Sequence, residues 1–221
     1  MINFFKKFVD FIFPESCLLC ELELVKTERQ ICSSCIPLLS RFEPDIYDSH
    51  KKFLGRIKIN DINAMFIYNK SSYVQKLIHQ IKYKSNYELA QILGEEYARK
   101  NNVTEIDIIV PVPLHQNKLR SRGYNQSMEW AKGISKFSNI DAEEIITRTE
   151  DTTTQTKRKR IDRWENVKDS FSINPNIDLT NKTILLVDDV ITTGATIESC
   201  AQLLLDNNAS QVHVAAIAIA H

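Results

Sequence analysis

The sequence predicts an α/β fold, in which one parallel sheet of βαβ units follows a small segment with four cysteines. Short apolar strand-like segments alternate with segments whose apolar residues have helical spacing, and this alternation is typical of parallel sheets. Two Cys-x2-Cys pairs precede all of these segments. The expected strands are residues 64–68, 107–110 and 184–187, and the expected helices are residues 73–83, 88–100, 127–136 and 196–206.

Length and composition leave room for one main core. The chain has 221 residues, 43% of them apolar, which suits one domain of about 150 residues and a small appendage. Its 28 basic and 28 acidic residues cancel. The charge of the whole protein therefore does not predict nucleic-acid binding, and any such binding needs a local basic patch.

The N-terminal residues 1–14 are typical of an amphipathic helix rather than a secretory signal. Asp10 interrupts their apolar part, and no small-residue cleavage site follows. Such a helix packs on the body of the protein, or it binds a membrane surface or a partner, and both alternatives stay open here. No apolar run approaches the roughly 20 residues of a membrane span. We therefore expect a cytoplasmic protein without a transmembrane segment.

The string ILLVDDVITTGAT, residues 184–196, predicts a site for a phosphorylated ribose. Its apolar run suits a central parallel strand, and ligands of open α/β sheets bind at the carboxyl ends of such strands. Asp188 and Asp189 at that end can accept hydrogen bonds from the vicinal hydroxyls of a ribose. The loop that follows offers backbone N–H groups, hydroxyls and a helix N-terminus to a phosphate. The loop residues are Thr192, Thr193, Gly194, Ala195 and Thr196.

Other interpretations of this string are weaker. A strand end followed by an ordinary turn does not require so long an ordered pattern. The chain contains no Walker-type phosphate loop and no G-x-G-x-x-G string, which disfavours two other kinds of nucleotide site.

A second polar cluster follows the expected strand at residues 107–110. A stiff proline turn can cradle a diphosphate, and the three cations after it can neutralise one, since arginine engages two oxygens at once. The alternative is a solvated basic turn, with a histidine that has no chemical role. The turn contains Pro113, Leu114 and His115, and the cations are Lys118, Arg120 and Arg122.

The four N-terminal cysteines predict a structural zinc site. Cys17 and Cys20, and then Cys32 and Cys35, form two Cys-x2-Cys pairs separated by 11 residues. Four thiolates in this arrangement complete a tetrahedral shell without an open position. The alternative is two disulfides, which the lack of a secretory signal disfavours. A segment of about 20 residues cannot build its own core, so zinc binding is expected to supply folding free energy. Cys200 stands apart and is expected to be a packed core thiol.

These strings together resemble a known family. ILLVDDVITTGAT is similar to the phosphoribosyl pyrophosphate (PRPP) signature of type I phosphoribosyltransferases. With VPVPLHQNKLRSRGYNQS, the pattern Arg148-x6-Gln155-x7-Arg163-x2-Asn166-x4-Phe171 and the double Cys-x2-Cys head, the chain resembles the ComF family over nearly its whole length. Members combine a zinc-ribbon-like segment with a type I phosphoribosyltransferase domain. One departure is Ser85, where relatives usually carry glycine.

The resemblance implies a division of the chain and a set of ligands. Residues 1–40 would hold the amphipathic helix and the zinc-ribbon-like segment, residues 41–62 a connector, and residues 63–221 the phosphoribosyltransferase-like domain. PRPP would bind with Mg²⁺, which prefers oxygen ligands. A polar loop after residue 148 would close over PRPP through Gln155, Arg163 and Asn166.

The same loop contains the best local candidate for a DNA contact. Residues 157–160, Lys-Arg-Lys-Arg, can contact a phosphate backbone, and Trp164 can stack on a base. The alternatives are a solvated basic face and a tryptophan that anchors the loop to the body.

Two functions stay open. The resemblance implies a competence or DNA-uptake protein that binds PRPP and handles incoming single-stranded DNA with a helicase partner. The alternative is an active phosphoribosyltransferase, in which a nitrogen acceptor displaces pyrophosphate from C1 of PRPP and Asp188 and Asp189 are the catalytic residues. The sequence contains no recognisable acceptor pocket, and the zinc segment takes the place of the variable hood of this fold.

Overall fold

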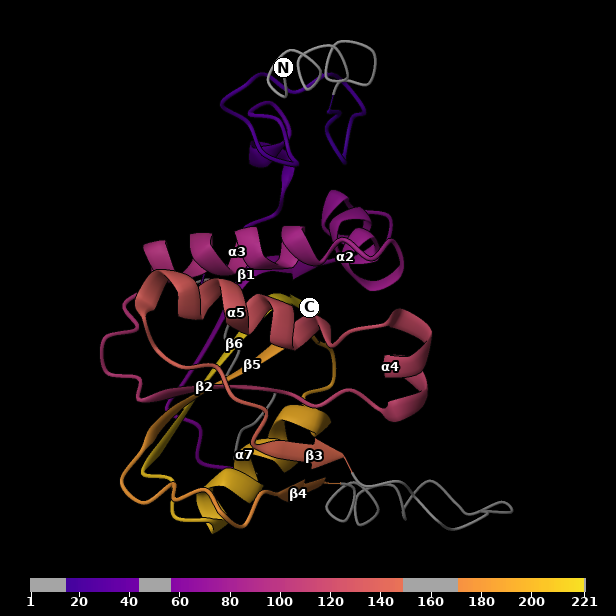
Figure 1. Ribbon diagram of the computed structural model, residues 1–221. Coiled ribbons are helices and arrows are strands. Elements are labelled where there is room, and N and C mark those ends of the chain that lie inside the picture. Colours follow the sequence, from indigo (N-terminus) through magenta and orange to yellow (C-terminus); the bar gives the residue numbers. More distant parts are fainter. Residues whose placement is uncertain (1–14, 44–56, 149–170, 221) are drawn as a thin grey trace, which may run out of the picture.

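The computed structural model describes residues 15–43, 57–148 and 171–220. Within them, the central element is a parallel sheet of four strands in the order β1, β6, β5, β2 (Figure 1). This confirms the predicted α/β fold. β1 comprises Asp61–Tyr68, β2 Ile108–Pro111, β5 Thr183–Ile191 and β6 Gln211–Ala220.

β5 and β6 form the middle of the sheet because they are apolar on both faces. Residues 184–187 of β5 and residues 214–219 of β6 are buried. Leu186 lies opposite Val214 on one side and Val110 on the other. Strands that are covered on both faces are typically continuous apolar runs of this kind. The ILLVDDVITTGAT string therefore starts in the centre of the sheet.

Helices cover both faces of the sheet (Figure 1). α3 and α5 lie on one face, whereas α7 lies on the other face beside a hairpin of β3 and β4. Each face has its own hydrophobic cluster, with Trp130 in the first and Cys200 in the second. Cys200 is fully buried, as expected for a core thiol. These elements comprise Tyr87–Lys100 (α3), Gln126–Ser138 (α5), Ala195–Asp206 (α7), Ile146–Arg148 (β3) and Phe171–Ile173 (β4).

Two glycines allow α3 and α5 to pack closely. A Cβ atom on Gly94 would overlap the backbone oxygen of Trp130, and one on Gly133 would overlap the backbone oxygen of Gln91. Since any larger side chain would push the helices apart, these positions set the distance between them.

α2 (Tyr73–Tyr83) and α4 (Gln116–Arg122) lie together on one side of the molecule, toward the right in Figure 1. α2 begins at Ser72, whose hydroxyl accepts a hydrogen bond from the Gln75 backbone N–H over 3.2 Å. Its apolar side, with Leu77 and Ile81 fully buried, packs into the same cluster as α3. The opposite side of α2 is left for polar residues.

The four-cysteine head, residues 15–43, sits on α3. Gln30 anchors it by accepting a hydrogen bond from Asn86 over 2.9 Å and donating one to Glu88 over 3.3 Å. The head ends in backbone pairing with β1, where the Phe42 N–H donates to the Met65 oxygen over 3.2 Å. It contains one short 3-10 helix, η1 (Ile36–Leu38). Leu19, Ile31 and Leu39 of the head are buried in the cluster that also contains α3 residues.

The element boundaries lie close to those expected from the sequence. α2 spans the predicted residues, α3 and α7 each begin one residue earlier, and β1 begins three residues earlier. No helix was predicted at residues 116–122, but these residues form α4. Among the described residues, no helix combines the length and the apolar character that a bilayer span requires. The predicted helix at residues 1–14 lies outside the described residues.

Candidate ribose-phosphate site

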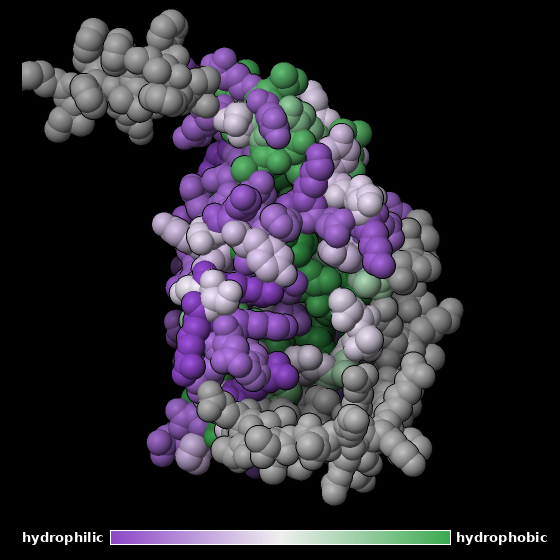
Figure 2. All heavy atoms as spheres, turned by 90° about the vertical axis from the view of Figure 1, so that its right-hand side faces the viewer, coloured by the Kyte–Doolittle hydropathy of each residue, from purple (hydrophilic) through white to green (hydrophobic). Residues whose placement is uncertain are grey.

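A cavity of about 440 Å³ opens beside the carboxyl ends of β1 and β5. Its walls come from α2, from the segment between β2 and α4, from the start of α5 and from the start of α7. Figure 2 shows this side of the molecule, where hydrophilic residues flank a hollow that has hydrophobic residues inside it. The carboxyl end of the sheet was the predicted position for a ligand.

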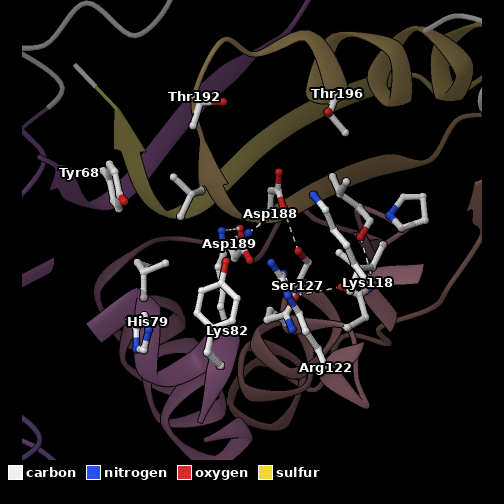
Figure 3. A pocket seen from close by; sticks show the side chains of 18 of the residues that line it. Tyr68, His79, Lys82, Lys118, Arg122, Ser127, Asp188, Asp189, Thr192 and Thr196 are labelled. Carbon is white, nitrogen blue, oxygen red and sulfur yellow. Dashed lines mark hydrogen bonds and ion pairs between the residues drawn. The ribbon is translucent and has the colours of Figure 1, made fainter. Parts of the chain in front are cut away.

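Asp188 and Asp189 lie in the middle of the cavity lining (Figure 3). They belong to β5, which continues two residues beyond them. Asp188 Oδ1 accepts a hydrogen bond from Ser127 Oγ over 2.9 Å and another from the Asp189 backbone N–H over 2.8 Å. Asp189 Oδ1 forms an ion pair with Lys82 Nζ over 3.0 Å. The two carboxylates are therefore held by different neighbours, one from α5 and one from α2.

Burial changes the pKa of Asp188. Loss of solvation, followed by the neighbouring charge of Asp189, raises the pKa of Asp188 to about 7. The hydrogen bond from Ser127 and the charge of Lys82 act in the opposite direction, but they do not compensate. A carboxyl group with a pKa near neutrality changes its charge within the physiological range. A cation or a set of hydroxyl donors at this point would favour its ionised form.

Asn125 ties the start of α5 to the segment that follows β2. Its side-chain N–H donates to the Val112 backbone oxygen over 3.1 Å, and its carbonyl accepts from the Ser127 backbone N–H over 3.1 Å. Asn125 is thus the N-cap of α5, and it sets the position from which Ser127 reaches Asp188.

The predicted phosphate loop borders the cavity. Thr192 and Thr196 line it, at the top of the view in Figure 3. Gly194 has φ +83°, a left-handed conformation that favours glycine, and it serves as the N-cap of α7. Thr193, Gly194 and Ala195 belong to the same loop but are not among the lining residues. The N-terminus of α7 offers backbone N–H groups and a positive dipole end to an anion.

Only two of the three predicted cations line the cavity, because all three lie on the helix α4. Lys118 and Arg122 are one helical turn apart and both line the cavity, whereas Arg120 points elsewhere and donates to Gln116 Oε1 over 3.4 Å. α4 ends at Gly123, whose φ of +82° is again left-handed. The cations therefore reach the cavity because residues 116–122 are helical, which the sequence did not indicate.

Only part of the proline turn before α4 lines the cavity. Pro113 and Leu114 line the cavity, whereas His115 does not. His115 is the N-cap of α4, and its Nδ1 accepts a hydrogen bond from the Asn117 backbone N–H over 3.1 Å. The structure thus gives this histidine a capping role.

Several residues that line the cavity were not predicted from the sequence. α2 contributes a stripe in which Gln75, His79 and Tyr83 are four residues apart, as are Ile78 and Lys82 beside them. This spacing places side chains on one helix face, so the polar side of α2 was a usable signal. The remaining missed lining residues are Tyr68, Val112, Asn125, Gln126, Ser127, Arg148 and Val190.

The four head cysteines converge on one point. All four sulfurs lie within 4.8 Å of one another, and the Cys20 and Cys32 sulfurs are 3.7 Å apart. None of them forms a disulfide. The backbone N–H groups of Leu19 and Cys32 point at Cys17 Sγ over 3.5 and 3.3 Å. Burial by itself raises the pKa of the Cys17 thiol, but backbone hydrogen bonds of this kind outweigh it and lower the pKa to about 6. Four converging sulfurs with such N–H donors fit a tetrahedral metal ion.

Other predicted residues lie outside the part of the chain that the structure describes. They are Gln155, Arg163 and Asn166, the basic residues 157–160, and Trp164.

Comparisons with known proteins agree with this geometry. A family model described as a phosphoribosyl transferase domain matches residues 144–221, which include α7 and β6. DNA utilization protein YhgH of Escherichia coli K12 is 35% identical over 146 residues, which cover 62% of this chain and 63% of the relative. Competence protein F of Haemophilus influenzae is 28% identical over 62% of this chain and 64% of the relative. Competence protein ComFC of Bacillus subtilis is 22% identical over 86% of this chain and 88% of the relative.

The parallel sheet, the aspartate pair with its phosphate loop and the matching family model define a type I phosphoribosyltransferase fold. A head in which four cysteines converge precedes this fold. With the relatives named above, these features support the resemblance of the chain to the ComF family.

Proposed function

We propose that this protein binds PRPP together with Mg²⁺ at the cavity and acts in the uptake or use of incoming DNA. The observation that carries the proposal is the convergence of three kinds of group on one cavity. Two carboxylates lie in the middle, hydroxyls and a helix N-terminus on one side, and Lys118 and Arg122 on another. The names of the relatives, which refer to competence and DNA utilization, support the biological part.

Each part of PRPP has a complementary wall. Asp188 and Asp189 accept hydrogen bonds from the ribose hydroxyls, and the loop from Thr192 to Thr196 binds the 5′-phosphate. Lys118 and Arg122, with Pro113 and Leu114 beside them, bind the diphosphate, which carries most of the negative charge. Mg²⁺ would be held mainly by ligand oxygens and by the aspartates, and it would neutralise the diphosphate.

The head would hold one Zn²⁺ through its four cysteines, in a structural role. Residues 157–160 and Trp164 would contact single-stranded DNA, and a competence helicase would be the partner. The amphipathic residues 1–14 offer one surface for such a partner.

Calorimetric titration with PRPP and Mg²⁺ tests the ligand. The wild-type protein should bind, and the double variant Asp188→Ala, Asp189→Ala should lose at least a hundredfold in affinity, since each lost charged hydrogen bond costs roughly 1.5–3 kcal/mol. Asp206→Ala, at the exposed end of α7, is the matched control. Zinc content measured by mass spectrometry should not change in any variant. Retained affinity in the double variant would falsify the site assignment.

A gel shift with single-stranded DNA tests the nucleic-acid part. Neutralising residues 157–160 should weaken binding and reduce its dependence on salt, because fewer counterions are released. An unchanged salt dependence would remove this run from the proposal.

A working phosphoribosyltransferase is the second candidate, and one observation favours it. The cavity extends beyond the groups that match PRPP, toward α2. In the reaction, a bond forms between the acceptor nitrogen and C1, the C1–O bond to pyrophosphate breaks with its electron pair, and the nitrogen loses a proton. Asp188 and Asp189 would stabilise the positive charge that develops on the ribose.

Incubation of the protein with PRPP, Mg²⁺ and an extract of small metabolites and nucleic acid separates the two candidates. Continuous pyrophosphate release with a ribosylated product supports the enzyme. Tight PRPP binding without release supports a sensor or scaffold.

A further inference from the structure

A second cavity, of about 260 Å³, lies at the amino edge of the sheet, opposite the edge that holds the ribose-phosphate site. It is bordered by the first residues of β1 and β6, by Leu185 of β5 and by the end of α3. Because α3 runs away from α2, its last turn lies on the far side of the molecule from α2 and α4 (Figure 1). The two cavities share no lining residue.

Hydrogen bonds between β1 and α3 build the wall of this amino-edge cavity. Asp61 of β1 lies opposite His213 of β6, and Asn63 follows two residues later on the same face of the sheet. Asn63 Nδ2 donates to Asn101 Oδ1 over 2.7 Å, and Asn101 Nδ2 donates to the Tyr97 backbone oxygen over 2.8 Å. The polar side chains of the cavity are therefore held by the fold.

Tyr97 brings a buried hydroxyl to the cavity. Only 4% of its surface is exposed, and its ring packs edge-on against Trp130 with 5.3 Å between the centroids. No residue in the described part of the chain forms a hydrogen bond with the Tyr97 hydroxyl. Burial, followed by the nearby charge of Asp61, raises the pKa of this hydroxyl. Since buried polar groups nearly always have a partner, an unpartnered hydroxyl beside a cavity indicates a ligand.

The charges around the amino-edge cavity favour a cation. Asp61 forms no ion pair with the described residues, and no lysine or arginine is among the described residues that line the cavity. Arg99 and Lys100, in the last turn of α3, both pair with Glu96. The C-terminal end of α3 adds a partial negative charge. A cation here would meet an unpaired carboxylate and a hydroxyl oxygen.

Apolar side chains in the lining favour an organic cation over a metal ion. Hard metal ions take six or more oxygen ligands, and Asp61 carries the only carboxylate among the described lining residues. Leu185 and Val214 instead offer surface for a carbon chain, as do Val103 and Ile106. The volume of the cavity limits the ligand to a small molecule.

We propose that the amino-edge cavity binds a small organic ammonium compound, an aliphatic monoamine or diamine, through Asp61 and the Tyr97 hydroxyl. The ammonium group donates to the Asp61 carboxylate and to Tyr97 Oη, and the carbon chain packs against Leu185 and Val214. This site is separate from the ribose-phosphate cavity and does not depend on the proposed PRPP binding.

Calorimetric titration of the full chain with butylamine, 1,4-diaminobutane and butan-1-ol tests the site. At least one amine should bind with a dissociation constant of about 1 mM or lower, which is attainable for so few ligand atoms. Butan-1-ol has the same carbon chain without the charge, and it should bind at least about tenfold more weakly. Titration with Mg²⁺ alone should give no competing binding.

Two variants assign the binding to the cavity. Asp61→Asn should weaken amine binding at least about tenfold, since a hydrogen bond to a charged group has this order of magnitude. Tyr97→Phe keeps the ring packing against Trp130 and should weaken binding about threefold or more. Asp141→Asn is the matched control, because Asp141 is exposed and does not line the cavity. PRPP affinity should not change in any of the three variants.

Several outcomes would overturn the ammonium site. They are the lack of saturable binding by either amine, equal binding of butylamine and butan-1-ol, displacement of the amines by Mg²⁺, and an equal loss in Asp141→Asn and Asp61→Asn. If Asp61→Asn does not fold, Tyr97→Phe decides, and unchanged amine affinity in that variant contradicts the proposal. None of these outcomes bears on PRPP binding, which is measured separately.

Discussion

The four-cysteine head and the carboxyl edge of the sheet both gather groups that bind charged ligands, but they do so in opposite ways. In the head, four sulfurs face one another and three of the four cysteines are buried. At the sheet edge, two neighbouring carboxylates share one cavity and repel each other, and Lys82 forms an ion pair with only one of them, Asp189. The sulfurs of the head converge on a point that fits a single metal ion, whereas the edge faces a cavity large enough for a small molecule.

The difference shows how a polar cluster can be assigned to stability or to ligand binding. The four cysteines of the head would complete one coordination shell and leave no position for a reactant, which is typical of structural metal sites. The groups of the edge keep a destabilising feature, the raised pKa of Asp188, beside an open cavity. Such a perturbed carboxyl group persists where a ligand uses it.

Removal of the head metal should have the largest effect. A strong chelator, or Cys17→Ser, should unfold residues 15–43 and lower the thermal midpoint by 10 °C or more, since structural zinc contributes roughly 10–16 kcal/mol to small zinc domains. PRPP affinity should stay within about threefold, because no head residue lines the cavity. Calorimetry and thermal scans measure the two effects, and Cys200→Ser is the control. A parallel loss of PRPP binding would show that the two regions are one functional unit.

Asp188→Asn should weaken PRPP binding but stabilise the folded protein. The folded protein holds the Asp188 proton up to about pH 7, well above the ordinary carboxyl pKa of 3.8. The stability that this proton provides is complete below pH 3.8 and is lost as the pH rises through 7. The variant should therefore unfold several degrees above the wild type at pH 8, with a smaller difference at pH 5, although its PRPP affinity falls at least tenfold.

The same pKa predicts the pH dependence of PRPP binding. Ribose hydroxyls and Mg²⁺ need the ionised carboxylate, so wild-type affinity should rise as the pH increases from 6 to 8 and level off above the Asp188 pKa. Titrations across this range should show the rise in the wild type and a much flatter profile in Asp188→Asn. Equal slopes in both proteins would assign the pH dependence to another group.

Ser85→Gly should have the smallest effect, and it tests whether the two regions are independent. Ser85 lies between α2, which lines the cavity, and α3, which supports the head. Its φ of +52° is left-handed, a conformation that costs a non-glycine residue roughly 1–2 kcal/mol. The variant should gain about 1 kcal/mol in unfolding free energy, measured by denaturant titration, with unchanged PRPP affinity. A loss of stability would mean that the serine side chain has a contact that matters more than the backbone strain.

Local patterns in the sequence were sufficient for three strands of the parallel sheet, for four helices and for two groups of site residues. The apolar run at residues 184–187 predicted a central strand, and the spacing of the four cysteines predicted their convergence. Both depend on short-range chemistry: burial on two faces of one strand, and turns that place two sulfurs side by side. The division of the chain at residues 40 and 62, and the roles assigned to the site residues, stay predictions.

Other parts of the site depend on contacts between segments far apart in the chain. Lys82 reaches Asp189, 107 positions later in the sequence, only because α2 and the end of β5 border the same cavity. Ser127 reaches Asp188 only because Asn125 ties the start of α5 to Val112. α4 turns two of three cations inward, and α2 turns its polar side toward the cavity. Amino-acid order specifies which groups are present and how each short segment folds, but the position of one segment against another follows from packing of the whole core, and that packing created the cavity.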